Sequence, residues 1–147
     1  MNKELKVSDS ISINAPASRV WNALVNPEMT KKYMFDCEAI SDWKAGSPLI
    51  WKSASDGKVY VKGAIVKIEP EKFLRYTTFD PNGNYKDVPS NYLTVDYVLS
   101  KENGGTLLSV SQGDYASVEN GQKRYEETVG GWGMVLSKIK EIVESED

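Results

Sequence analysis

The chain has 147 residues, of which 40% are hydrophobic and 27% are charged, and its net charge is -3 at pH 7. These values are typical of one globular domain over residues 1–147, and the acidic balance argues against nucleic-acid binding, which needs a basic face. Histidine is absent and cysteine occurs once. The composition therefore excludes a histidine general base and argues against a zinc site.

No stretch approaches the roughly 20 apolar residues of a membrane span, and residues 1–6 lack the apolar core of a secretory signal. The single cysteine, Cys37, has no partner for an internal disulfide and suits the role of a small apolar filler. We therefore expect a cytoplasmic protein without cofactor or metal.

The N-terminal segment predicts one strand followed by two short helices. Residues 6–14 alternate between apolar or acidic and polar side chains, which is the period of a half-buried strand. Pro16 suits the first turn of a helix, and an apolar stripe follows it. Asn26 and Pro27 end that helix, and Pro27 can open a second one through residues 30–34.

The central part of the chain predicts six strands separated by turns. The expected strands are residues 37–43, 49–53, 58–68, 73–79, 92–100 and 106–112. Mixed alternation around Gly63 indicates a bulge or bend. The irregular stretches 80–90 and 113–121 are candidate lids or binding loops, with plain surface connections as the alternative.

From Lys123 the apolar period becomes helical and continues toward the C-terminus. Gly130, Gly131 and Gly133 flank Trp132 in this segment, and a glycine inside a helix costs roughly 1 kcal/mol relative to alanine. Close approach of the helix to the sheet, or space for a ligand beneath the helix, would offset that cost. We expect Trp132 and Leu136 to be nearly inaccessible to solvent.

The order of one strand, two short helices, six antiparallel strands and one long helix resembles the helix-grip fold. Sequence motifs along nearly the whole chain strengthen the resemblance. They are Ile13-x-Ala15-Pro16-Ala17-x-x-Val20-Trp21-x-Ala23-Leu24, Pro27-Glu28, Ser41-Asp42-Trp43-x-x-Gly46, Gly63, Ile68-Glu69-Pro70, Leu74-x-Tyr76-Thr77 and Gly131-Trp132-x-x-x-Leu136. In this order and spacing they resemble the Hsp90 ATPase activator homologue family, within the START-like and Bet v 1-like (SRPBCC) superfamily.

This resemblance implies an α+β helix-grip domain, in which a seven-stranded antiparallel sheet curves around a long C-terminal helix and encloses a deep cavity. Members of the superfamily bind lipids, sterols, polyketides and plant hormones, and some catalyse cyclisation. The eukaryotic co-chaperone is similar only in its C-terminal domain, and its activating N-terminal domain has no counterpart in this sequence. We therefore expect binding of a small hydrophobic molecule. The alternatives are an interaction module for an Hsp90-type chaperone and a cyclase- or aromatase-type enzyme.

The expected cavity wall combines aromatic and small side chains, with an ordinary filled core as the alternative. We assign to it Trp43, Trp51, Tyr76, Tyr97, Val110, Gln112, Gly131, Trp132, Val135 and Leu136. Asp114 and Glu127 are candidates for a polar mouth, where apolar walls could raise a carboxylate pKa and suit it to acid–base work. Arg75 and Asp96 have outward parity and are expected on a solvated surface. No catalytic residue is assigned.

Overall fold

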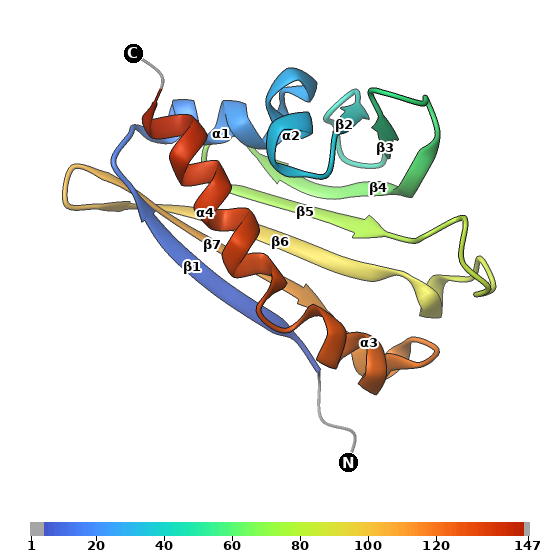
Figure 1. The fold of residues 1–147 in the computed structure, drawn as a ribbon. Helices are drawn as coiled ribbons and strands as arrows, with labels where there is room; N and C mark the ends of the chain where they lie inside the picture. The colour runs from blue at the N-terminus through green and yellow to red at the C-terminus, as the bar shows by residue number, and fades with distance from the viewer. Residues whose placement is uncertain (1–4, 146–147) are drawn as a thin grey trace.

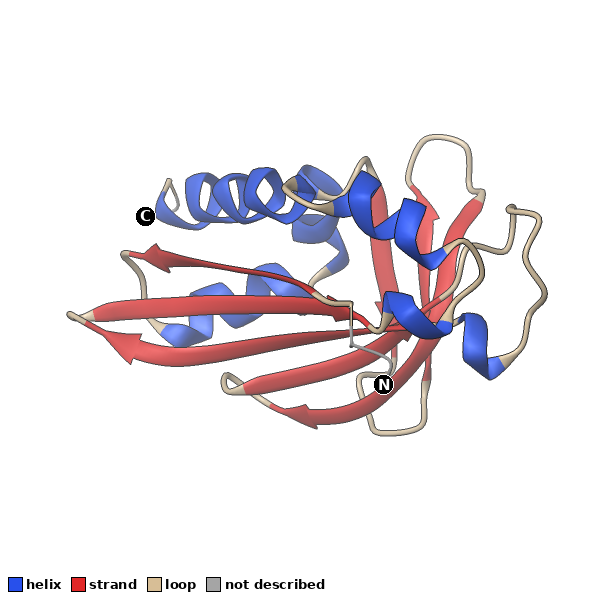
Figure 2. Ribbon diagram, turned by 90° about the horizontal axis from the view of Figure 1, so that it is seen from below, coloured by secondary structure: helices blue, strands red, loops and turns tan. Residues whose placement is uncertain are grey.

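The computed structural model describes residues 5–145 and arranges them as a curved sheet with helices on its concave side (Figures 1 and 2). The strands are β1 (Val7–Ile13), β2 (Cys37–Ser41), β3 (Pro48–Ser53), β4 (Val59–Glu69), β5 (Phe73–Thr78), β6 (Leu93–Glu102) and β7 (Gly105–Gly113). The helices are α1 (Ala17–Val25), α2 (Pro27–Tyr33), α3 (Gly121–Thr128) and α4 (Gly131–Glu144), with short 3-10 turns η1 (Pro89–Asn91) and η2 (Tyr115–Ser117).

Across residues 5–145 the sheet has seven strands in the order β1-β7-β6-β5-β4-β3-β2, and each neighbouring pair is antiparallel. The first strand therefore pairs with the last one, while the remaining strands follow one another as a meander. This arrangement confirms the predicted seven-stranded antiparallel sheet and the two short helices after the first strand. Helix α4 crosses the sheet diagonally and packs on β1 and α1 (Figure 1).

The two short helices begin and end where the sequence signals indicate. In α1 the side chains of Val20, Ala23 and Leu24 are buried, which is the i, i+3, i+4 stripe of an amphipathic helix. The side chain of Asn26 accepts a hydrogen bond from the backbone N–H of Glu28 at 3.0 Å and caps α2. Pro27 occupies the first position of α2, as predicted, and the helix ends at Tyr33.

Two strand irregularities shape the sheet. Strand β2 ends at Ser41, short of the predicted residue 43, because Trp43 adopts a left-handed backbone conformation with φ of 55°. In β4 the pairing register with β5 shifts between Ile65 and Lys67, close to the bend predicted around Gly63. A Cβ atom on Gly63 would lie 1.7 Å from the backbone oxygen of Thr77, so only glycine permits this close approach of two strands.

The C-terminal helical segment is present as predicted, but it is interrupted. Helix α3 ends at Thr128, and α4 begins at Gly131. Between them Gly130 has a left-handed backbone with φ of 88°. Helical periodicity alone does not reveal this break, since a turn of two residues leaves the apolar stripe nearly in phase. Gly130 is therefore part of a turn, and Gly131 and Gly133 are the glycines that lie inside the helix.

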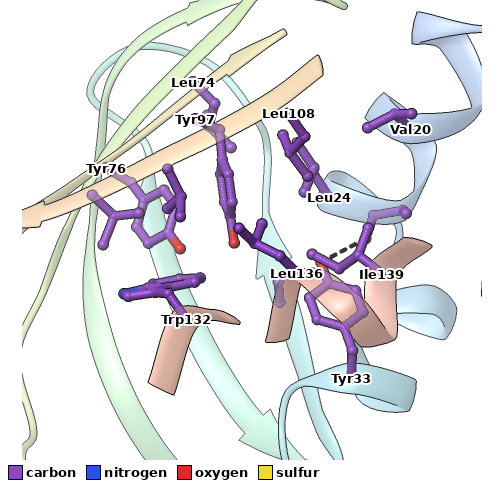
Figure 3. Packing of buried hydrophobic residues seen from close by; sticks show 14 of the residues in the cluster. Val20, Leu24, Tyr33, Leu74, Tyr76, Tyr97, Leu108, Trp132, Leu136 and Ile139 are labelled. Atoms are coloured by element: carbon purple, nitrogen blue, oxygen red, sulfur yellow. Dashed lines mark hydrogen bonds between the residues drawn. The ribbon is translucent and has the colours of Figure 1, made fainter. Parts of the chain in front are cut away.

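The core lies between α4 and the sheet. Leu136, Ile139 and Val143 of α4 are fully buried, and they face side chains such as Leu24 of α1 and Leu108 of β7 (Figure 3). The expectation that Trp132 and Leu136 are nearly inaccessible is confirmed, with exposed fractions of 8% and 1%. Within residues 5–145, no helix is both long enough and apolar enough to span a bilayer.

The outer edge of β1 is covered by side chains. The ammonium group of Lys140 donates to the backbone oxygen of Ser12 at 2.7 Å, and the backbone N–H of Asn14 donates to a carboxylate oxygen of Glu144 at 2.7 Å. Lys140 and Glu144 also form an ion pair with each other at 2.6 Å. Helix α4 therefore satisfies backbone groups that an edge strand would otherwise present to another strand.

Candidate functional site

A cavity of about 850 Å³ lies between the sheet and the helices α3 and α4. Its volume falls in the range of roughly 300–1,000 Å³ that is usual for small-molecule sites. Strands β2 to β7 contribute side chains to the wall, together with the turn between α2 and β2. The wall is mainly apolar and aromatic, with a small number of polar groups. This composition suits a guest whose surface is largely hydrocarbon.

A row of aromatic rings crosses the inner end of the cavity. The ring of Tyr76 lies 6.1 Å from that of Trp51 and 6.2 Å from that of Tyr97. Tyr97 in turn meets Trp132 edge to face at 5.9 Å (Figure 3). Period-2 alternation places the three strand residues on the same face of the sheet, and α4 supplies Trp132 from the other side. These contacts fix the rings, so the inner wall is rigid.

Ten of the twelve residues assigned from the sequence fall into two groups. One group lines the cavity, and its members are Trp51, Tyr76, Gln112, Glu127, Gly131, Trp132 and Val135. Three further residues, Tyr97, Val110 and Leu136, are buried behind this wall in the core. All three face inward as alternation and helical period predict, but neighbouring side chains separate them from the open space.

The remaining two assigned residues have structural roles. Trp43 follows β2 and packs half-buried against the core, away from the cavity wall. The carboxylate of Asp114 caps η2 by accepting from the backbone N–H of Ala116 at 2.9 Å, and it also accepts from the N–H of Leu5 at 2.8 Å. These hydrogen bonds hold the end of β7 to the N-terminal segment. Neither side chain contributes a group to the cavity.

Four polar groups lie at or just behind the aromatic end of the cavity. The indole N–H of Trp132 donates to the side-chain oxygen of Gln112 at 2.9 Å. Burial raises the pKa of both Tyr76 and Tyr97, so their hydroxyls remain protonated at neutral pH. These two hydroxyls are near enough to affect each other's pKa, but the Tyr97 hydroxyl forms no hydrogen bond of good geometry with any group in the described part of the chain.

The mouth of the cavity is bordered by α3 and the loop between β5 and β6. The guanidinium group of Arg124 lies 4.5 Å from the ring centre of Tyr85, a cation–π contact that joins the two segments. Asn91 adds a second link, since its side-chain oxygen accepts from the backbone N–H of Glu119 at 3.0 Å. Both stretches proposed as lids or binding loops therefore meet at the mouth. Glu127 lies there too, exposed on α3.

Several wall residues had not been assigned from the sequence. Leu93 and Val95 share the inward face of β6 with Tyr97, so strand alternation was a signal that could have found them. Phe35 lies in the turn after α2, with 81% of its surface exposed and φ of 52°. No periodic pattern marks such a turn. The wall also includes the thiol of Cys37, whose pKa is raised by burial.

The outer face of the sheet carries the charged pair expected there. The guanidinium group of Arg75 and the carboxylate of Asp96 form a bidentate contact at 2.8 and 2.9 Å. Residues 75 and 96 are directly opposite each other on β5 and β6. Among residues 5–145, no group of three or more histidine, cysteine or acidic side chains is arranged to hold a metal ion.

Comparison with known proteins identifies relatives over nearly the whole chain. The sequence model of the family described as "Activator of Hsp90 ATPase homolog 1-like protein" matches residues 14–144. The solution structure of ChR145 from Cytophaga hutchinsonii is 36% identical, with a TM-score of 0.76 over 98% of this chain and 97% of the other. No curated protein matches.

More distant solved structures share the fold. The Aha1 dimer from Colwellia psychrerythraea is 14% identical, with a TM-score of 0.71 over 95% of this chain and 96% of the other. DynU16, a protein of the dynemicin biosynthetic locus, is 15% identical, with a TM-score of 0.74 over 97% of this chain and 48% of the other. At these identities the likeness concerns the arrangement of helices and strands alone.

Proposed function

Because the chain belongs to the Activator of Hsp90 ATPase homolog 1-like family and encloses an apolar cavity beneath its C-terminal helix, we propose that it binds a small hydrophobic molecule there. The ligand would be of lipid, sterol, polyketide or aromatic type. The observation that carries the proposal is the cavity of about 850 Å³ whose inner end is walled by Trp51, Tyr76 and Trp132. Aromatic walls of this kind offer large apolar contact area to planar or aliphatic guests.

The shape of the site supports a binding role further. Both ends of the wall are fixed, the inner end by ring contacts and the mouth by the contact of Arg124 with Tyr85. A preformed site loses little conformational entropy when a guest enters, and that saving raises affinity. Helix α3, which borders the mouth, has no buried side chain.

A thermal-shift screen of fatty acids, sterols and flavonoid-like aromatics tests this proposal. A guest that binds only the folded state stabilises it by about 2.7 kcal/mol at a hundredfold excess over the dissociation constant. We expect at least one compound class to raise the unfolding midpoint and to change tryptophan emission, since Trp51 and Trp132 line the cavity. If no compound moves the midpoint, the binding proposal is wrong.

Two substitutions at Gly131 provide the matched control. Gly131 lines the cavity, and a Cβ atom built on it has no neighbour within 4 Å. Gly131→Leu should occupy the space and abolish the thermal shift, whereas Gly131→Ala adds one methyl group and should keep it. Both variants should fold, since each replaces a helical glycine by a better helix former. Equal ligand binding by both variants would place the ligand elsewhere.

The family description favours a second candidate function, contact with an Hsp90-type chaperone. Such contact would use the surface of the domain and would not need an open cavity. Measuring the ATPase rate of an Hsp90-type chaperone with the parent protein and with Gly131→Leu distinguishes the two functions. Stimulation that survives Gly131→Leu would support the chaperone role independently of any ligand.

A further inference from the structure

The side-chain amide of Gln112 presents its N–H donors without a partner. The indole of Trp132 can only donate, so the Gln112 atom that it meets at 2.9 Å must be the oxygen. This contact fixes the orientation of the amide, which leaves the Nε2 group as the unused end. No atom of residues 5–145 accepts a hydrogen bond from that Nε2 group. Since Gln112 lines the cavity, its free donors belong to the wall.

The two tyrosine hydroxyls beside it interact with no polar side chain except each other. Tyr97 has a fully buried hydroxyl without any hydrogen-bond partner in the described part of the chain, and this is costly in a folded protein. Tyr76 lines the cavity, and its hydroxyl approaches that of Tyr97 without forming a hydrogen bond of good geometry to any group within residues 5–145. In contrast, the buried hydroxyl of Tyr33 donates to the backbone oxygen of Ala23 at 2.6 Å.

The charges around the cavity indicate that the missing partner is neutral. The charged side chains of the wall are Arg124, Glu127 and Asp80, one cation against two carboxylates. Arg124 is already engaged with the ring of Tyr85 and with the backbone oxygen of Glu119. An anionic guest would therefore bury its charge next to two carboxylates without an available cation, which is unfavourable.

We propose that the inner end of the cavity is a subsite for a neutral hydrogen-bond acceptor, such as a ketone, on an otherwise apolar guest. In this subsite Tyr76 and Gln112 donate to the acceptor oxygen, and Tyr97 supports Tyr76 from behind. The inference rests on the proposed binding function and adds the chemical class of the ligand. It also accounts for an unpaired hydroxyl in the middle of the core.

Benzophenone and diphenylmethane are suitable probes, because they share two rings and differ by one carbonyl group. Their dissociation constants are measured by quenching of tryptophan emission, and the ketone preference is the ratio of the diphenylmethane value to the benzophenone value. A neutral hydrogen bond contributes about 1 kcal/mol, so we expect Tyr76→Phe to lower this preference about fivefold to tenfold. Comparison between variants cancels the difference in hydrophobicity between the two probes.

Two further variants test the assignment of donors. Gln112→Glu keeps an oxygen for Trp132 but removes the N–H donors, and it should also lower the ketone preference. Tyr33→Phe removes a hydroxyl outside the cavity and should leave the preference unchanged. If Tyr76→Phe and Gln112→Glu both keep the parent preference, the subsite is wrong while apolar binding stands. If neither probe binds the parent protein, the subsite proposal is wrong, and the thermal-shift screen decides the proposed binding function separately.

The stability of the unliganded protein gives an independent test of whether the Tyr97 hydroxyl lacks a partner. Tyr97→Phe removes an unpaired buried hydroxyl, so its unfolding midpoint should equal or exceed that of the parent. Tyr33→Phe leaves the carbonyl of Ala23 without its donor, so its midpoint should fall. A fall for Tyr97→Phe as large as that for Tyr33→Phe would mean that the Tyr97 hydroxyl is satisfied without a ligand, and this would overturn the proposal.

Discussion

Trp132 serves the core and the cavity wall at the same time. One edge of its indole packs against the ring of Tyr97, and its N–H donates to Gln112, while other atoms line the cavity. A side chain in this position couples ligand binding to stability, because any guest that touches it also contacts the core. The same residue gives the most direct test of the packing between α4 and the sheet.

Trp132→Ala should lower the free energy of unfolding by about 3–5 kcal/mol, as expected for the loss of a large buried aromatic side chain. Urea denaturation followed by circular dichroism measures this change. Trp132→Phe retains most of the apolar area and should cost distinctly less. A loss below about 1 kcal/mol for Trp132→Ala would be too small for a core position and would show that this part of α4 packs loosely.

At the scale of elements, the break between α3 and α4 separates a helix at the surface from a helix that packs in the core. Helix α4 buries Trp132, Leu136, Ile139 and Val143, whereas α3 buries no side chain. The turn at Gly130 lets the two helices take different directions. The part of the C-terminal segment that borders the mouth is therefore packed less deeply than the part that anchors the core.

Gly130→Ala should destabilise the protein by about 1–2 kcal/mol, because a Cβ atom is strained at φ of 88°. Gly131→Ala is the control, since residue 131 is the first residue of α4 and alanine is a better helix former. Differential scanning calorimetry of both variants measures the contrast. An unchanged midpoint for Gly130→Ala would mean that the turn can be replaced by continuous helix.

The contacts of Lys140 and Glu144 with the β1 edge predict that the stability of the protein depends on pH. The hydrogen bond from Asn14 and the ion pair with Lys140 lower the pKa of Glu144 below its ordinary value. A lowered pKa in the folded state contributes stability above the unfolded value, and this contribution disappears as pH falls through the folded value. Glu144→Gln should therefore be less stable than the parent at pH 6, and the difference should vanish in strong acid.

Urea midpoints between pH 6 and pH 3 measure this effect. Glu141→Gln is the matched control, because residue 141 lies on the same helix with an exposed side chain and no ion pair within residues 5–145. It should follow the parent across the whole range. A Glu144→Gln deficit that persists unchanged at pH 3 would show that the contribution does not depend on the carboxylate charge.

At the scale of the whole molecule, alternation and helical period were sufficient to predict the sheet, most of the helical segments and three of the four inward strand aromatics, Trp51, Tyr76 and Tyr97. Val95 and Tyr97 of β6 and Leu136 of α4 are buried, as these patterns indicate. The boundary of the cavity could not be predicted in the same way. Tyr76 and Tyr97 have the same parity, but only Tyr76 lines the cavity. That difference depends on where α4 crosses the sheet.

Sequence periodicity also could not predict features that depend on the backbone angles of single residues. Phe35, Trp43 and Gly130 all have positive φ, and each redirects the chain at a point where the surrounding pattern suggests continuity. The first borders the cavity, the second ends β2, and the third separates α3 from α4. Local backbone conformation at these positions therefore sets where elements end, while the repeating patterns set the scaffold.

The pairing of the first strand with the last has a consequence for how the molecule folds. Residue Val7 pairs with Gln112, so β1 cannot enter the sheet until β7 exists. Contacts between residues so distant in sequence close large loops and slow the folding of a chain. During synthesis β1 would wait unpaired while the meander forms. The N-terminal strand is thus the segment most exposed to misassociation before folding is complete.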